Sequence, residues 1–122
     1  MAVLGLHHSG GSDAIEKLVA EKGIPLELCP SSNVIGQTVR GYSDHHFKEW
    51  AVSRDHPVSI CTDDMGVFKT SLSKEYALIA EHFELDQKQI CQLVRKSYDL
   101  IFADEEIKKA LGLKIDATLT LV

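Results

Sequence analysis

The strongest constraint on the fold is a pair of short apolar segments that each run into polar residues. Ile24–Cys29 contains Pro25 and Glu27 but is otherwise apolar and ends at Pro30, and Val58–Cys61 is apolar except for Ser59. Short apolar runs bounded by turn-forming residues are typical of buried strands. Helical patterns alternate with these runs. The sequence therefore predicts an α/β fold with a parallel sheet buried on both faces.

Five segments have helical spacing or helix-capping signals. Asp13 and Glu16 are spaced as a capping box ahead of an apolar stripe that Gly23 can end. Asp86 and Gln89 open a later helix in the same way. The predicted helices are Asp13–Lys22, His45–Ser53 with Phe47 and Trp50 buried, Lys74–Phe83 capped by Ser73, a helix from Asp86 whose apolar spacing continues to Ile101, and Glu105–Leu111. Residues Lys114–Val122 alternate weakly and are left unassigned, with an extended tail as one possibility.

The composition excludes several classes of protein. The chain has 122 residues with 13 Lys and Arg against 18 Asp and Glu, a formal charge of −5, so it offers no basic face for a nucleic-acid polymer. No run of about 18 apolar residues is present to span a membrane, and the first residues lack the features of a signal peptide. We therefore expect a cytoplasmic protein with no membrane or nucleic-acid partner.

Cysteine and histidine give weak signals for catalysis or metal binding. The three cysteines, Cys29, Cys61 and Cys91, have no CxxC spacing and fit reduced, buried thiols. Adjacent histidines cannot chelate a metal from one face of a helix or strand. We expect structural roles for all six histidines, His7, His8, His45, His46, His56 and His82.

Polar residues follow both predicted strands, where parallel α/β proteins place their functional groups. Ser31, Ser32 and Asn33 follow the first, and Thr62, Asp63 and Asp64 follow the second. Adjacent carboxylates are costly unless a cation compensates, and a divalent metal is a common compensator. One reading is a metal site. The other is that Asp63 caps the next segment while Asp64 faces water.

Several motifs in a fixed order resemble the C-terminal part of the adenosine deaminase family. They are LELCPSSN at 26–33, His56–Pro57, ICTDD at 60–64 with Val67–Phe68, and LSKEYA at 72–77. QTV at 37–39, HHFKEW at 45–50 and Met65–Gly66 resemble the branch that acts on N6-methyl-AMP. The resemblance covers about Gly10 to Ala110, and the whole of 1–122 is interpreted as one partial domain.

The resemblance implies a fold, a reaction and two site residues. Members of the family fold as a TIM (β/α)8 barrel of the metal-dependent hydrolase type and use zinc. They hydrolytically deaminate a purine nucleoside or nucleotide, and the resemblance here favours N6-methyl-AMP over adenosine. Asp63 corresponds to a zinc ligand, and Asp64 corresponds to a residue that contacts the purine. The cofactor implied is zinc.

The departures from the family pattern imply an incomplete site. The family's HxH pair, its fifth-strand histidine and its general acid/base glutamate have no counterparts here, so no catalytic residue is assigned. Met1–Leu6 and then His7–His8 stand where the sixth strand and its histidine are expected. We expect about the last third of a barrel, with two strands and open edges, that is inactive alone. The alternative is a non-catalytic interaction protein that associates with a full-length paralogue or a complementary fragment.

Overall fold

The computed structural model describes residues 2–3 and 12–119, and its centre is a small parallel sheet with the strand order β1-β2-β3. The strands are β1 (Ala2–Val3), β2 (Leu26–Leu28) and β3 (Val58–Ile60). Leu26 pairs with Val58 and Leu28 with Ile60. The parallel α/β arrangement predicted from the two apolar runs is confirmed, with each strand shorter than its run.

Strand β1 corrects the expectation of two strands. Ala2 pairs with Leu26 and Val3 with Glu27, so β1 covers one edge of β2. Two residues are too few to show the alternation by which a strand is recognised in a sequence. Within the described residues, β3 pairs with a neighbour on one side only.

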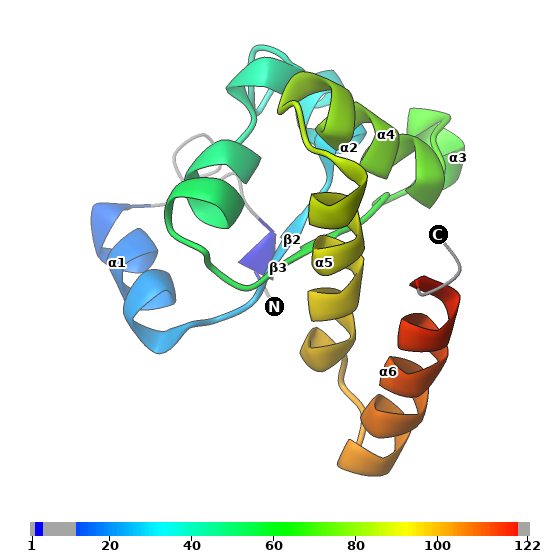
Figure 1. The fold of residues 1–122 in the computed structure, drawn as a ribbon. Coiled ribbons are helices and arrows are strands. Elements are labelled where there is room, and N and C mark those ends of the chain that lie inside the picture. The colour runs from blue at the N-terminus through cyan, green and yellow to red at the C-terminus, as the bar shows by residue number, and fades with distance from the viewer. Residues whose placement is uncertain (1, 4–11, 120–122) are drawn as a thin grey trace.

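Six α-helices, two 3-10 segments and one π-helical segment surround these strands in the described part of the chain. In Figure 1, α1 and α5 flank β2 and β3, and α6 lies beside α5. The segments are α1 (Asp13–Lys22), α2 (Pro30–Ile35), η1 (Tyr42–Asp44), η2 (Lys48–Ser53), α3 (Met65–Phe68), α4 (Leu72–His82), α5 (Gln87–Ser97), η3 (Tyr98–Leu100) and α6 (Glu105–Leu119).

The bounds of α1 agree with the prediction, but its N-cap does not. Ser12, in an extended conformation, accepts a hydrogen bond from the Ile15 N–H, whereas Asp13 was expected to cap the helix. Asp13 instead occupies the first turn, where a carboxylate interacts favourably with the helix dipole. Gly23 ends the helix at φ 60°, the left-handed conformation that glycine adopts without a steric penalty.

The caps of α4 and α5 follow the same rules with one change of residue. Ser71 caps α4 by accepting from the Lys74 N–H, so the helix begins before Ser73, the predicted cap. The capping box of Asp86 and Gln89 is confirmed at α5. That helix ends at Ser97 and continues as the 3-10 segment η3, short of the predicted limit.

The turn-forming residues after β2 form a helix, α2, where a loop was predicted. Pro30 occupies the first helical position, where a missing N–H costs nothing. The local composition of serine and asparagine suits loops and helix starts equally, and here tertiary contacts decide between them.

Helix α6 is longer than predicted and includes most of the segment left unassigned. It runs from Glu105 to Leu119, so an extended conformation is wrong for residues 114–119, and 120–122 lie outside the described residues. A Cβ at Gly112 would lie 3.0 Å from the Tyr98 ring, so glycine permits close approach here. Arg95 of α5 also binds Asp116, with an Nε–Oδ1 distance of 2.6 Å. These contacts favour helix where alternation was weak.

The hydrophobic core lies between one face of the sheet and the helices. Leu26, Leu28, Val58 and Ile60 point into it and are at most 3% exposed. Val19, Phe47, Trp50 and Ile79 complete the buried cluster, which confirms the predicted burial of Phe47 and Trp50. Glu27 and Ser59 alternate with these residues on the other face and are half-buried. Within the described residues, helices cover one face of the sheet more fully than the other.

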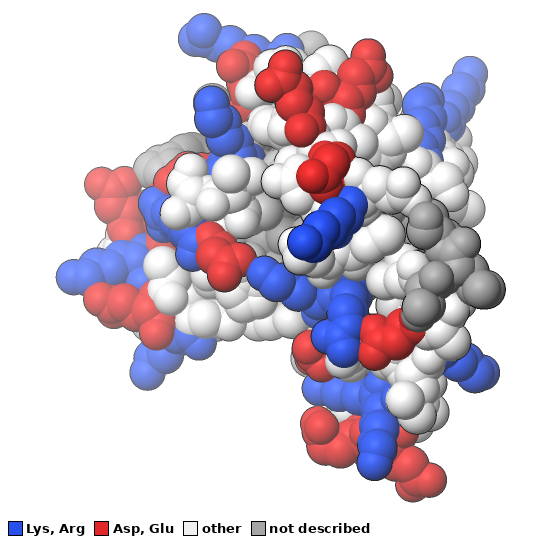
Figure 2. Space-filling view, viewed as in Figure 1, with Lys and Arg blue, Asp and Glu red and all other residues white. Residues whose placement is uncertain are grey.

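The surface and the helix lengths add two observations. On the face drawn in Figure 2, acidic and basic side chains are interspersed rather than segregated by sign. In the described ranges, no helix combines the length and apolar character needed to cross a membrane.

Candidate functional site

The two polar strand exits meet at one edge of the sheet. Ser32, in α2 after β2, donates its hydroxyl hydrogen to Oδ2 of Asp63, which follows β3, over 2.8 Å. Asp63 has φ 55°, a left-handed conformation that is uncommon outside glycine. Its carboxylate is solvent-exposed. The structure thus brings together residues from the two polar strand exits that sequence analysis singled out.

Asp64 has a different local role. Its Oδ1 accepts a hydrogen bond from the Val67 N–H over 3.1 Å, which makes Asp64 the N-cap of α3. The structural reading left open above is therefore wrong in taking Asp63 as the cap, and it is right that Asp64 is exposed; both aspartates are solvent-exposed. The two aspartates therefore bond to different elements, Asp63 to α2 and Asp64 to α3.

Glu75 is a buried carboxylate beside this edge that sequence analysis missed. It lies in the first turn of α4 and is 0% exposed. Its Oε2 accepts the Ser31 N–H of α2 over 2.8 Å, and its Oε1 accepts a hydrogen bond from the Thr70 hydroxyl. A glutamate early in a helix normally indicates only a favourable interaction with the helix dipole, so the local sequence does not predict that Glu75 is buried.

His45 is the clearest structural histidine. Its Nδ1 accepts the Phe47 N–H over 3.1 Å, so the ring proton is on Nε2, which donates to Asn33 Oδ1 over 2.8 Å. Burial, and secondarily the neighbouring His46, lowers the pKa of His45 to about 4. The ring is neutral at physiological pH and fully hydrogen-bonded, as a structural role requires.

Other histidines within the described ranges also make structural contacts. The His56 ring lies 2.8 Å from the Ile24 carbonyl through Nε2, and it meets Trp50 edge-on. His82, the last residue of α4, stacks on Tyr42. His7 and His8 lie outside the described residues.

The cysteines are free thiols, as predicted, but of the three only Cys29 is buried, and Cys61 and Cys91 are partly exposed. Burial, followed by the charges of Cys61 and Asp63, raises the pKa of Cys29 to about 12. Burial also raises the pKa of Cys61. Because the thiolate is the reactive species, neither residue is an activated nucleophile near neutral pH.

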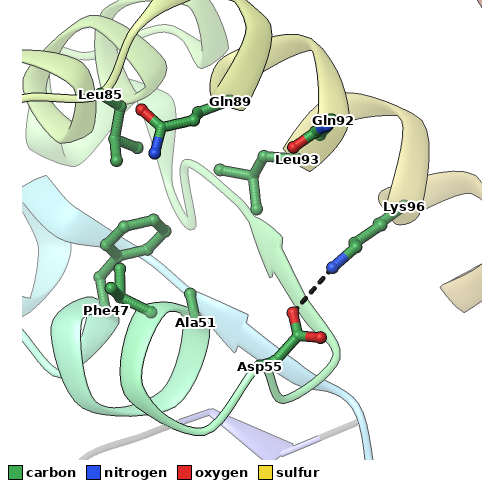
Figure 3. A pocket seen from close by; sticks show the side chains of 9 residues that line it. Phe47, Ala51, Asp55, Leu85, Gln89, Gln92, Leu93 and Lys96 are labelled. Carbon is green, nitrogen blue, oxygen red and sulfur yellow. Dashed lines mark hydrogen bonds and ion pairs between the residues drawn. The ribbon is translucent and has the colours of Figure 1, made fainter.

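A separate cavity of about 240 Å³ lies between η2 and α5, away from the strand exits. In Figure 3, Phe47 and Ala51 face Leu85 and Leu93, and the Lys96–Asp55 ion pair of 2.8 Å stands at one end. None of the strand-exit residues lines this cavity. The site that the polar residues define is therefore at the sheet edge rather than in this cavity.

Polar side chains at the carboxyl ends of two adjacent parallel strands are where α/β proteins place functional groups, and comparison with known proteins identifies the family. The adenosine deaminase family profile matches residues 8–118. The chain belongs to the adenosine deaminase family.

Relatives within the family are N6-methyl-AMP deaminases. The human protein of that name is 49% identical over 86% of this chain, and the zebrafish one (Danio rerio) is 47% identical over 84%. The chain spans only 29% of each relative's length.

Solved structures agree with the sequence comparison. The structure described as the ADAL–IMP complex superposes with a TM-score of 0.85 at 33% identity, over 91% of this chain and 32% of that one. An Arabidopsis ADAL complex with GMP superposes with a TM-score of 0.83 at 34% identity, over 88% of this chain and 31% of that one. The fold is therefore similar to about a third of these deaminases.

The donor set does not fit a zinc site built by the described residues alone. Across 2–3 and 12–119, no group of three or more histidine, cysteine, aspartate or glutamate side chains is arranged to hold a metal ion. Catalytic zinc sites use about three protein ligands. Asp63 offers one carboxylate, so any zinc bound by the family arrangement requires ligands from elsewhere.

Proposed function

We propose that this chain forms the C-terminal part of a (β/α)8-barrel purine deaminase that acts on N6-methyl-AMP. The reaction consumes water and releases methylamine, giving an inosine-type nucleotide; adenosine is the second candidate substrate. Identity of 47–49% to N6-methyl-AMP deaminases supports this substrate, and the similar structures solved as complexes with IMP and GMP support a nucleotide ligand. A cytoplasmic location stays a prediction.

The observation that carries the proposal is the contact between Ser32 and Asp63 at the carboxyl ends of adjacent parallel strands. Functional groups in such folds converge at this edge. We assign Asp63 as the one zinc ligand that the described residues contribute to the complete family site. The Ser32 hydroxyl occupies one lone pair of Oδ2 and leaves the other carboxylate oxygen of Asp63 available to a metal.

We assign Asp64 to the substrate. The Val67 N–H holds its Oδ1, so the orientation of the carboxylate is set before a ligand arrives. An exposed, oriented carboxylate is suited to accept hydrogen bonds from, or share a proton with, a purine ring.

The test uses this chain in two settings. The 122-residue protein alone, assayed with zinc against adenosine, AMP and N6-methyl-AMP, should show no turnover because the described residues supply one proposed ligand. A chimera, in which the chain replaces the matching 29% of the human relative, should deaminate N6-methyl-AMP.

In the chimera, Asp63→Ala should abolish turnover, and Asp64→Ala should lower it with a rise in KM. Asp116→Ala, at a partly exposed position on α6, is the matched control and should leave kcat/KM within about twofold, since ion pairs open to solvent contribute little. Full activity of the Asp63→Ala chimera would exclude the proposed ligand role.

The second candidate function is association with a complementing polypeptide. It is supported by β3, which pairs on one side only within the described residues, and by the half-buried Glu27 and Ser59 on the less covered face. An unpaired strand edge is a template for another strand. Co-purification of the chain with the N-terminal part of the human relative supports this function; a monodisperse monomer in that mixture contradicts it.

A further inference from the structure

We propose that Glu75 is a positioning residue for Asp63 and acts through the first turn of α2. The inference rests on the role proposed for Asp63, but its structural half is tested without activity. Glu75 and Asp63 share no direct hydrogen bond among the described residues; the link is the Ser31 N–H and the Ser32 hydroxyl.

The start of α2 lacks a cap of its own. Pro30 has no N–H, and the side chain of Cys29, the N-cap residue, makes no capping hydrogen bond. The Ser31 N–H is therefore the first donor of the helix, and it is buried. Because an unpaired buried donor is unfavourable, this turn depends on an acceptor from another element.

Glu75 supplies that acceptor from α4. Its carboxylate is 0% exposed and accepts from two uncharged donors, the Ser31 N–H at 2.8 Å and the Thr70 hydroxyl. The two donors fix both oxygens, so the carboxylate holds α2 in one position relative to α4.

The position of α2 then determines where the Ser32 hydroxyl lies. Ser32 follows the clamped residue directly and donates to Asp63 Oδ2 over 2.8 Å. Asp63 itself is exposed and has a left-handed φ of 55°, a conformation that aspartate tolerates better than most residues other than glycine, so the Ser32 bond serves to orient its carboxylate. Glu75 thus contributes to the orientation of the proposed ligand without touching it, as groups behind a metal ligand commonly do.

The first experiment is NMR on the 122-residue chain without metal. Glu75→Ala should move the Ser31 amide proton resonance and also the Asp63 carboxyl carbon resonance, since loss of the clamp releases Ser32. Glu75→Gln should restore both toward wild type: its amide oxygen can accept from Ser31, and its amide N–H can donate to Thr70.

The matched control is Ile79→Ala, one turn along α4 in the buried core, where the side chain is 2% exposed. This variant should lower stability and leave the Asp63 resonance in place. An Asp63 resonance unmoved by Glu75→Ala, or moved equally by Ile79→Ala, would overturn the inference. If Glu75→Ala does not fold, Thr70→Val is used: it removes one donor to the same carboxylate and should move the Asp63 resonance less and in the same direction, and no movement overturns the inference.

The second experiment measures turnover in the chimera. Glu75→Ala should lower kcat about 10–100-fold, the usual range for a group behind a metal ligand, and Glu75→Gln should recover most of it. Ser32→Ala combined with Glu75→Ala should cost no more than the larger single effect, because both act on Asp63 by one route. Fully additive losses contradict that route. An inactive wild-type chimera counts against the proposed function alone, and the NMR result still decides the position of Asp63.

Discussion

The Ser32 hydroxyl donates to Oδ2 of Asp63 over 2.8 Å, joining two residues 31 positions apart in the chain. This bond links the exits of adjacent parallel strands and orients a carboxylate in an unfavourable backbone conformation. It is the contact on which the functional proposal depends, so it is the first to be tested.

Removing this hydroxyl should reduce the activity of the chimera. We expect Ser32→Ala to lower kcat/KM for N6-methyl-AMP about 10–100-fold, because the Asp63 carboxylate loses the donor that orients it. Ser53→Ala, which removes an exposed hydroxyl bonded to the Lys48 carbonyl, serves as the control and should have little effect. Steady-state kinetics on both variants measure kcat/KM, and equal values for the two variants would contradict the orienting role of Ser32.

Stability should fall as the pH drops because of His45. Burial lowers its pKa from the usual 6.5 to about 4. Between these values the unfolded chain binds a proton that the folded chain does not, so stability is complete above pH 6.5 and is lost as the pH falls toward 4. The linkage relation gives a loss of about 3 kcal/mol across this window.

Urea unfolding at pH 7, 5.5 and 4.5 measures this dependence. In His45→Gln this contribution to the pH dependence should be absent, while the protein is less stable at pH 7 because the bond to Asn33 is altered. The control is His82→Gln, a variant that removes a different histidine and keeps the buried imidazole of His45. An unchanged pH slope in His45→Gln would show that other groups carry the dependence.

The end of α1 should be sensitive to substitution at Gly23. Its φ of 60° is unfavourable for L-residues, and a Cβ there would meet nothing within 4 Å, so the cost of Gly23→Ala comes from the backbone alone. We expect a loss of about 1 kcal/mol by chemical denaturation. Gly41→Ala is the control, since Gly41 is extended and equally open; equal losses at both glycines would rule out the backbone explanation.

The thiols should differ in reactivity. Cys29 is 3% exposed and has a pKa of about 12, so it should alkylate slowest in the folded chain at pH 8, whereas Cys91 is partly exposed on α5. Mass spectrometry of iodoacetamide-treated protein, digested to separate the cysteines, measures each rate. The difference should disappear in urea, and rapid alkylation of native Cys29 would contradict its burial.

Much of the secondary structure is encoded locally. The bounds of α1, the capping box of α5 and the cores of β2 and β3 follow from patterns within ten or so residues. The predicted N-caps of α1 and α4 lie one and two positions after the observed caps, Ser12 and Ser71, because neighbouring polar residues satisfy the same capping rule. The later part of α6 was not predicted, since its packing on Tyr98 and its bond to Arg95 are not local.

The candidate site divides in the same way. The sequence by itself determined the alternation of strands and helices, the family, and the placement of Ser32, Asp63 and Asp64 at strand exits, because these depend on periodicity and short motifs. Only the tertiary structure decided that Asp63 bonds to Ser32 and that Glu75 receives the Ser31 N–H from 44 residues away. The physical reason is that a hydrogen bond between residues far apart in the chain depends on which groups packing brings within 3 Å, and local sequence carries no record of that distance. The choice of Asp64 rather than Asp63 as the cap is local, and neighbouring aspartates satisfy the same capping rule.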